Sequence, residues 1–462
     1  MSVSTTNKQY NTMLPIWNKT RSAESGSNAI KGGGTKYLPQ LNGHEDDDYD
    51  KYKGRTVYYN FTGKTATGLK GMVFRKEPVI QISDELTDIS EHITPDGKSL
   101  TDLMQSVVSE LINPSRVGIL MDLPVQSTDG MTMQQVSELN IQPYLSMYVA
   151  ESIINWRTET INNVKMLTMC VLKEESEEVN ESDRFTTTAT VNYRVLELID
   201  NVYTVTIYDD GGSIIGESIQ PVINGVNLNY IPFWILNQNG ESIDIVSKPV
   251  IDDIADINIA HYVNSADYEN ALHWSGVRTV IVEGWPEDQD IKMGSAFGVP
   301  LGAKAYFLTA PTDDALSSAM ERKEGIMVSM GASLITKATG DVTATSSVIQ
   351  HQGEMSTITD IANNVSRVMT MIMKIFNGWI GNEDSSDINI KLNIDYNPLK
   401  MTGQEALALM QVFQGGGIDR NTLNYNYRKG EIIPANVSDE DLDANIKKEA
   451  SDNEANLFNI PQ

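Results

Sequence analysis

Apolar residues recur at helical spacing in two long stretches in the second half of the chain. Residues 249–276 carry the first series, with a member at every third or fourth position: Ile254, Ile257, His261, Ser265, Tyr268 and Leu272. Residues 346–379 carry the second series: Ile358, Ile361, Val365, Val368, Ile372 and Phe376. Each series predicts a helix with one buried stripe, because a membrane span needs about 20 nearly uninterrupted apolar residues. A shorter helix is predicted for residues 312–333, with Thr312, Asp313 and Asp314 as its cap.

Runs of strand length, either alternating or continuously apolar, fill residues 164–246, and turn sequences separate them at 209–212 and 237–240. This pattern predicts an antiparallel β region. The acidic run EESEEVNESD at 174–183 is predicted to be a solvated loop between its first two strands. Two further strands are predicted at 277–282 and 305–308.

The first 72 residues predict an arm followed by helix. Residues 1–35 are rich in Ser, Thr, Asn and Gly, which is typical of a flexible arm. Residues 37–72 are predicted to be helical after an acidic stretch, whose carboxylates favour a helix N-terminus.

Residues 83–112 predict two short helices, which are split by the turn sequence Pro95-Asp96-Gly97. A buried strand is predicted at 117–122. Residues 143–156 place four large side chains at helical spacing and predict a packed helix: Tyr144, Tyr148, Ile153 and Trp156.

The chain beyond residue 400 predicts small helices. The first covers residues 402–414 and ends at three glycines, 415–417. A short helical pair to Gly430 and an acidic, partly disordered tail from Ser438 are expected after it.

Composition adds a strong charge imbalance. The 462 residues exceed the size of one hydrophobic core, and they carry a net charge of −27, from 35 basic and 62 acidic residues. Proteins that bind the DNA backbone gain affinity from an excess of Lys and Arg, whereas this chain has more acidic than basic residues. The acidity fits either a well-solvated surface or one from which DNA slides without adhering. The single cysteine, Cys170, is predicted to be a buried strand thiol in a reducing compartment, and no secretory signal is expected.

Residue patterns indicate no catalytic, cofactor-binding or metal site. None of the five histidines has a Cys or His partner at metal-ligand spacing: His44, His92, His261, His273 and His351. Gly63-Lys64-Thr65 resembles the end of a phosphate-binding loop, but Tyr58 stands where that loop needs glycine. No cofactor is therefore expected.

The run DIADINIAHYVNSADYE at 253–269, followed by LHWSG at 272–276, resembles the core helix of a portal-like family found in tailed-phage genomes. Four shorter segments resemble the same family in the same order: YLP at 37–39, VYYN at 57–60, GMVFRKEP at 71–78 and MTGQE at 401–405. Together these segments bracket most of the chain, from residue 37 to residue 434.

The resemblance implies an α+β phage portal fold. Its parts would be a flexible arm at 1–35, a wing of helices and antiparallel β region at 36–248, stem helices at 249–276 and 312–333, a β-containing clip at 277–311, a tunnel loop at 334–345, a long wing helix with a return strand at 346–400, and crown helices with an acidic tail at 401–462.

The resemblance also implies the function. A portal protein forms a ring of twelve subunits at one capsid vertex of the virion, assembled in the host bacterial cytoplasm, and it is not an enzyme or a membrane protein. Double-stranded DNA enters and leaves through the channel. The other implied partners are the terminase large subunit, a tail adaptor, and the major capsid and scaffolding proteins.

Three sets of candidate residues follow from this assignment. The tunnel-loop set would face DNA: Thr336, Lys337, Thr339 and Gly340. The clip set would dock the motor and the adaptor: Trp285, Glu287, Asp288 and Asp290. The packing set would lie within or between subunits: Ile254, Ile257, His261 and Tyr268. For Lys337, phosphate contact and an ion pair with Asp341 are both open.

An acidic cytoplasmic hydrolase with a carboxylate pair is the alternative function. It predicts a small oligomer with a concave polar pocket, whereas a portal predicts a large ring without turnover.

Overall fold

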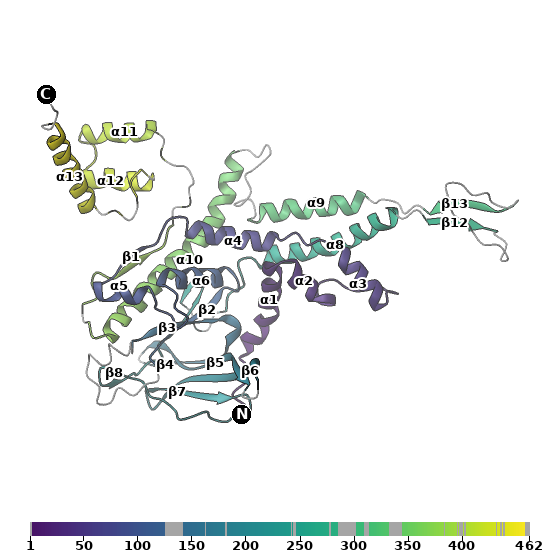
Figure 1. The fold of residues 1–462 in the computed structure, drawn as a ribbon, viewed down its shortest axis with the longest axis horizontal. Coiled ribbons are helices and arrows are strands. Elements are labelled where there is room, and N and C mark those ends of the chain that lie inside the picture. The colour runs from purple at the N-terminus through teal and green to yellow at the C-terminus, as the bar shows by residue number, and fades with distance from the viewer. Residues whose placement is uncertain are drawn as a thin grey trace. The chain divides into compact units, whose positions relative to one another are not determined.

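The computed structural model describes residues 2–124, 142–161, 163–180, 183–241, 243, 246–276, 279–284, 302–308, 314–331, 344–382, 384–394, 396, 401, 403–430, 432–434, 437 and 439–457 (Figure 1). The chain divides into two compact units. The first consists of Met1–Pro15, Gly68–Val250 and Thr345–Gln462, and the second consists of Ile16–Thr67 and Ile251–Ala344. Helices and antiparallel sheets make up both units, which confirms the predicted α+β class.

Two four-stranded sheets organise the first unit. One has the order β11-β10-β2-β3, with the bounds Gly240–Glu241, Phe233–Asn237, Arg116–Asp122 and Tyr144–Val149. The other has the order β4-β5-β6-β7, with the bounds Ile153–Ile161, Val164–Asn180, Asp183–Ile199 and Val202–Asp209. All strand pairs in both sheets are antiparallel, which confirms the antiparallel β region predicted for residues 164–246 and extends it to β2, β3 and β4.

Two sequence predictions in this region were wrong. Residues 143–156 form β3, the short 3-10 helix η2 (Ala150–Ser152) and the start of β4, not a helix. Tyr144 and Tyr148 are four residues apart, and a strand places such residues on one face just as a helix does. The acidic run 174–183 is not a loop, since residues 174–180 continue β5 and Asp183 begins β6. Carboxylates on an exposed strand reach water without interrupting the pairing.

Cys170 lies in the middle of the second sheet, opposite Trp156 on β4 and Leu196 on β6. The side chain is buried, as predicted, and burial raises the pKa of the Cys170 thiol to about 12. The thiol is therefore protonated at neutral pH and is a weak nucleophile.

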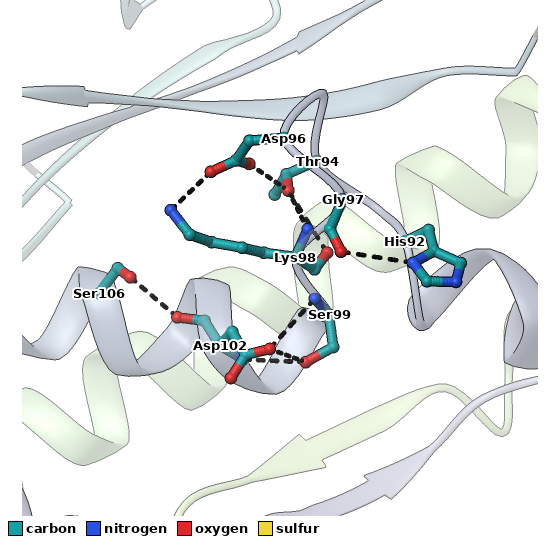
Figure 2. Close-up of polar contacts among 8 residues, drawn as sticks. All are labelled: His92, Thr94, Asp96, Gly97, Lys98, Ser99, Asp102 and Ser106. Atoms are coloured by element: carbon teal, nitrogen blue, oxygen red, sulfur yellow. Dashed lines mark hydrogen bonds and ion pairs between the residues drawn. The ribbon is translucent and has the colours of Figure 1, made fainter.

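The two predicted short helices are present as α5 (Asp84–Ser90) and α6 (Leu100–Ile112). Figure 2 shows how the turn between them ends. The Ser99 hydroxyl accepts a hydrogen bond from the Asp102 amide at 3.1 Å, and the Asp102 carboxylate accepts one from the Ser99 amide at 3.4 Å (Figure 2). This reciprocal capping box satisfies two amides at the start of α6.

Helix α10 (Ala344–Trp379) contains the second predicted stripe, and all six of its members are buried. Its Thr370 and Ser366 hydroxyls accept hydrogen bonds from the Ile390 and Leu392 amides, each at 2.9 Å. Strand β14 (Asn389–Lys391) is thereby fixed along the helix, and it pairs with β1 (Val79–Gln81). Strands β8 (Val222–Ile223) and β9 (Val226–Asn227) form a separate small pair.

Three helices follow at the C-terminal end: α11 (Gly403–Gln414), α12 (Arg420–Lys429) and α13 (Asp439–Leu457). The predicted α11 is present, but α12 replaces the expected helical pair. Helix α13 contradicts the partly disordered tail over residues 439–457. Asp439 supports its first turn by favourable charge and by an ion pair with Arg428 at 2.7 Å.

The second unit contains α2 (Ser27–Gly32), the 3-10 helix η1 (Gly34–Lys36), α3 (Asp46–Arg55), α8 (Asp252–Gly276) and α9 (Asp314–Ser329). Helices α1 (Lys8–Ser25) and α4 (Phe61–Val73) contribute their residues 16–25 and 61–67 to it. Helices α8 and α9 lie side by side in opposite directions, and their connection carries the hairpin of β12 (Thr279–Glu283) and β13 (Lys304–Leu308) (Figure 1). Both predicted strands of this hairpin are confirmed.

The flexible arm predicted for residues 1–35 was wrong. Helices α1 and α2 occupy most of it, and the side chains of Trp17, Ala23 and Ile30 are fully buried. Small and polar residues dominate the composition of this segment, but a few apolar side chains at helical spacing are enough to fix it on a core.

Candidate functional site

The side of α8 that is buried within the second unit defines the candidate site, because α8 coincides with the sequence run that resembles the portal-like family. Its buried residues are Asp252, Ile254, Ala255, Asn258, His261, Tyr262, Ser265 and Ala266. Each of them has another member of the set three or four positions away, so they lie along one side of the helix. Near its C-terminal end the helix emerges, with Leu272 39% and Trp274 55% exposed.

The predicted packing set divides between two environments. Ile254 and His261 are buried within their own chain, whereas Ile257 and Tyr268 are only half-buried. The apolar series predicted from the sequence, which includes Ile257 and His261, lies one residue before the centre of the buried face of α8. Asn258 and Tyr262 lie at that centre, and a search for apolar residues alone gives asparagine no weight.

Small and aromatic residues of α8 complete a core with the N-terminal helices. Ala255, Tyr262 and Ala266 belong to one buried cluster with Ala23, Ile30, Tyr37, Leu38, Tyr49, Tyr52 and Tyr58. The rings of Tyr58 and Tyr262 meet edge to face, with centroids 5.9 Å apart. The alanines let the neighbouring elements approach α8 closely, and two members of the cluster, Ala23 and Ile30, come from the arm that sequence composition predicted to be flexible.

Asn258 supplies the central polar contact. Its Nδ2 donates to the Tyr59 carbonyl at 2.7 Å, and its Oδ1 accepts from the amide and the hydroxyl of Thr62 at 3.1 and 3.0 Å. Thr62 lies in the first turn of α4, where backbone amides have no partner inside the helix. One fully buried amide side chain therefore caps α4 and fixes it to α8.

His261 joins α8 to α9. Its Nε2 lies 3.1 Å from Glu324 Oε1, and its ring lies 5.1 Å from that of Tyr59. Burial lowers the pKa of His261, against the opposing effect of the Glu324 carboxylate. The sequence-based view of His261 as a packing residue fits this environment, and among the described residues it belongs to no group of metal ligands.

Two contacts fix α3 and the segment after it along α8. The Tyr52 hydroxyl donates to Asp267 Oδ1 at 2.6 Å, and the Val57 amide donates to the Ser265 hydroxyl at 3.2 Å. Burial first, and then the Asp267 carboxylate, raise the pKa of Tyr52. The phenol is therefore a hydrogen-bond donor throughout the physiological pH range.

Lys19 forms ion pairs with the acidic start of α8. Its Nζ lies 2.8 Å from Asp252 Oδ1 and also contacts Asp256. Oxygens of Asp252, Asp253 and Asp256 lie within 4.8 Å of one another, which is the only such group of possible metal ligands among the described residues. The Lys19 ammonium contacts two of the three carboxylates and offsets one of their three negative charges.

The other two candidate sets lie outside the described residues: the tunnel-loop set Thr336, Lys337, Thr339 and Gly340, and the clip set Trp285, Glu287, Asp288 and Asp290. The same holds for Thr312 and Asp313 of the predicted cap. The described neighbours of the clip set are β12 and β13, which pair antiparallel from Thr279 opposite Leu308 to Glu283 opposite Lys304.

The first unit holds a polar pocket of about 560 Å³. It is lined by Gln81, Ile82, Thr370, Lys374, Ser386, Asp387, Ile388 and Asn389. Asp387 is the only carboxylate of this lining, so the pocket does not offer the carboxylate pair that the hydrolase alternative requires.

Among the described helices, none combines the length and the apolar composition that a bilayer crossing requires. A family described as a domain of unknown function (DUF4055) matches residues 250–380, which include α8, α9 and α10. A comparison with curated proteins found no match.

Solved structures of gene transfer agent (GTA) particles contain chains similar to this one. A chain in the neck of the native GTA particle, computed with C12 symmetry, has a TM-score of 0.39 and 10% identity, over 80% of this chain and 88% of that one. A chain in the virion of the native particle has a TM-score of 0.39 and 9% identity, over 84% and 94%. A chain in the neck of the empty particle, computed with C6 symmetry, has a TM-score of 0.38 and 10% identity, over 82% and 91%. Because each TM-score is below 0.5, nothing further is inferred from these similarities.

Proposed function

We propose that this chain is a portal protein: copies of it form a ring through which double-stranded DNA enters and leaves a phage-like particle. The observation that carries the proposal is the arrangement of α8, the β12–β13 hairpin and α9. Two antiparallel helices pack together, and their connection carries a small hairpin (Figure 1). This arrangement occurs where the sequence resembles the portal-like family, and it matches the stem and clip which that resemblance implies.

The packing within the second unit supports the assignment of α8 and α9 as stem helices. Contacts of Asn258, His261 and Lys19 fix α8 to α4, α9 and α1, respectively. An acidic helix pair is suited to a channel that DNA must pass without adhering to it.

The remaining roles follow from the resemblance. Residues 334–345 would line the channel, with Lys337 as its cation, and residues 285–302 would dock the terminase large subunit and the tail adaptor. A capsid protein and a scaffolding protein would surround the ring. Deleting residues 285–302 is expected to abolish motor binding in a pull-down and to leave ring assembly intact. Loss of rings with motor binding retained would instead make this segment an assembly element.

Native mass spectrometry of the purified chain tests the central proposal. A ring of about twelve copies is expected, whereas monomers or dimers at every protein and salt concentration would contradict it. The same preparation distinguishes the hydrolase alternative, which requires turnover by a small oligomer. The polar pocket with its single carboxylate gives that alternative no support.

Ile254 and Ile257 provide a matched pair for the packing between subunits. Ile254 is buried in its own chain. Ile254→Asp is therefore expected to lower the free energy of unfolding of the second unit by several kcal/mol, because it buries a charge without a partner. Ile257 is half-buried, so Ile257→Asp is expected to leave the monomer folded and to weaken ring formation. Circular dichroism and native mass spectrometry separate the two effects. Full ring assembly by Ile257→Asp would exclude this residue from the interface.

A further inference from the structure

The β5–β6 hairpin extends past the sheet that supports it. Strand β4 pairs with β5 only as far as Leu172, which lies opposite Ile153, and β7 pairs with β6 only from Asn192 onward. Residues 175–180 and 183–191 pair with each other beyond these points. We call this two-stranded segment the outer ribbon.

The outer ribbon is well formed and firmly anchored. Ser176 and Thr190 join their hydroxyls across the ribbon at 2.8 Å, and the Thr187 hydroxyl donates to Glu177 at 3.0 Å. At its base, Arg194 contacts Glu174 at 2.7 Å and Asp122 at 3.1 Å. The ribbon therefore leaves the sheet in a defined direction.

The ribbon nevertheless lacks support along both sides. Val179 is 61% and Phe185 is 82% exposed. No described strand pairs with the outward edge of either ribbon strand. A two-stranded ribbon is marginally stable alone in water, and its free edges offer unpaired backbone groups to another strand. These features indicate that another polypeptide covers the ribbon.

The two edges differ in charge. Residues 175–180 of β5 contain three glutamates and no basic residue, whereas residues 183–191 of β6 contain one acidic and one basic residue, Asp183 and Arg184, and so have no net charge. Like charges directly opposite each other destabilise a strand pair, so two β5 edges repel each other. A β5 edge therefore meets less repulsion from a neutral β6 edge than from a second β5 edge. Each copy carries one edge of each kind, so head-to-tail pairing around a closed ring leaves no edge free.

We propose that the outer ribbon joins neighbouring copies of this chain, with the acidic β5 edge of one copy against the threonine-rich β6 edge of the next. This inference rests on the proposed function, because only a closed ring satisfies every edge in this way. The ribbon would then be an assembly arm that is separate from the α8–α9 helices.

Mixed rings of chains that each carry one introduced, exposed cysteine test the direction of pairing. One chain carries Glu177→Cys and the other Thr188→Cys, with different affinity tags, and a short bismaleimide joins thiols that lie close together. The native Cys170 stays unmodified because it is buried. Cross-linked heterodimers are expected, with none from rings of either chain alone. Glu177→Cys homodimers, or rings without any cross-link, would overturn the proposal. Val164→Cys is the matched control, since Val164 is 60% exposed but lies at the opposite end of β5.

A shortened hairpin provides the second measurement. Replacing residues 177–189 by Asn-Gly leaves Ser176 opposite Thr190, as in a two-residue hairpin turn. The chain is expected to keep its circular dichroism spectrum and to lose at least tenfold in ring formation at a given concentration. Equal ring formation by the parent and shortened chains would refute the role of the ribbon. If the parent chain itself forms no ring, the proposed function fails instead.

Discussion

Asn258 satisfies three backbone and side-chain partners from a fully buried position on α8. Leucine has nearly the same size but no hydrogen-bonding group. In Asn258→Leu, the Thr62 amide would remain buried without a partner, whereas the Tyr59 carbonyl would still accept from the Phe61 amide. An unsatisfied buried donor costs about 1–3 kcal/mol.

We predict that Asn258→Leu lowers the free energy of local unfolding of α8 by about 1–3 kcal/mol, the cost of leaving the buried Thr62 amide unsatisfied. Hydrogen exchange of the α8 amides measures this quantity directly. Asn264→Leu is the matched control on the same helix, because Asn264 is only half-buried, and it is expected to change little. Similar exchange rates in the two variants would show that Asn258 does not fix α4 to α8.

His261 gives the second unit a defined pH dependence. Burial holds the pKa of His261 below its ordinary value of 6.5, so the folded chain prefers the neutral ring. Above pH 6.5 the ring is neutral in both states, and the stabilisation is fully present. As the pH falls below 6.5, the unfolded chain binds the proton first, and stability is lost until the pH passes the folded pKa.

We predict that the parent chain loses stability between pH 7 and pH 5 relative to His261→Gln, which cannot take up a proton there but can still donate to Glu324. Urea unfolding of both chains at several pH values measures the difference in their free energies of unfolding. The carboxylates that also titrate in this range are present in both chains and affect both equally. Parallel stability curves over this range would show that His261 does not titrate differently on folding.

At the scale of single elements, the start of α6 depends on two side chains that Figure 2 draws together. We predict that Ser99→Ala destabilises α6 by about 1 kcal/mol, because the Asp102 amide loses its acceptor. Ser106→Ala is the control. The Ser106 hydroxyl donates to the Asp102 carbonyl inside the helix, where alanine is at least as favourable. Hydrogen exchange in α6 that responds equally to both changes would contradict the capping role.

Elements with one dominant periodicity were predictable from the sequence. Helix α10 is such a case, because its apolar stripe has no break and all its members are buried. Prediction failed where two structures share a spacing, as at Tyr144 and Tyr148, and where tertiary packing outweighed composition, as at Trp17. The candidate site was only half predictable for the same reason. Apolar spacing identifies α8 and Ile254, but the role of Asn258 depends on Tyr59 and Thr62, which are distant in sequence.

At the scale of the whole molecule, the net charge of −27 opposes assembly. Every copy added to a ring brings further negative charge close to its neighbours, whereas apolar and backbone contacts between copies are short-ranged and nearly independent of salt. The Debye length is about 10 Å at 0.1 M salt and about 3 Å at 1 M. Salt therefore weakens the long-range repulsion more than it weakens the contacts.

We predict that the fraction of chains in rings rises as sodium chloride increases from about 0.05 M to about 0.5 M, since screening over a few ångströms removes most of the repulsion between copies. Sedimentation velocity at constant protein concentration measures the ring fraction. The Ile257→Asp variant separates the two contributions. Its contacts are weakened, so it should need more salt than the parent chain to reach the same ring fraction. A ring fraction that instead falls with salt would mean that attractive ion pairs between copies dominate assembly, and the acidic surface would then not be its main barrier.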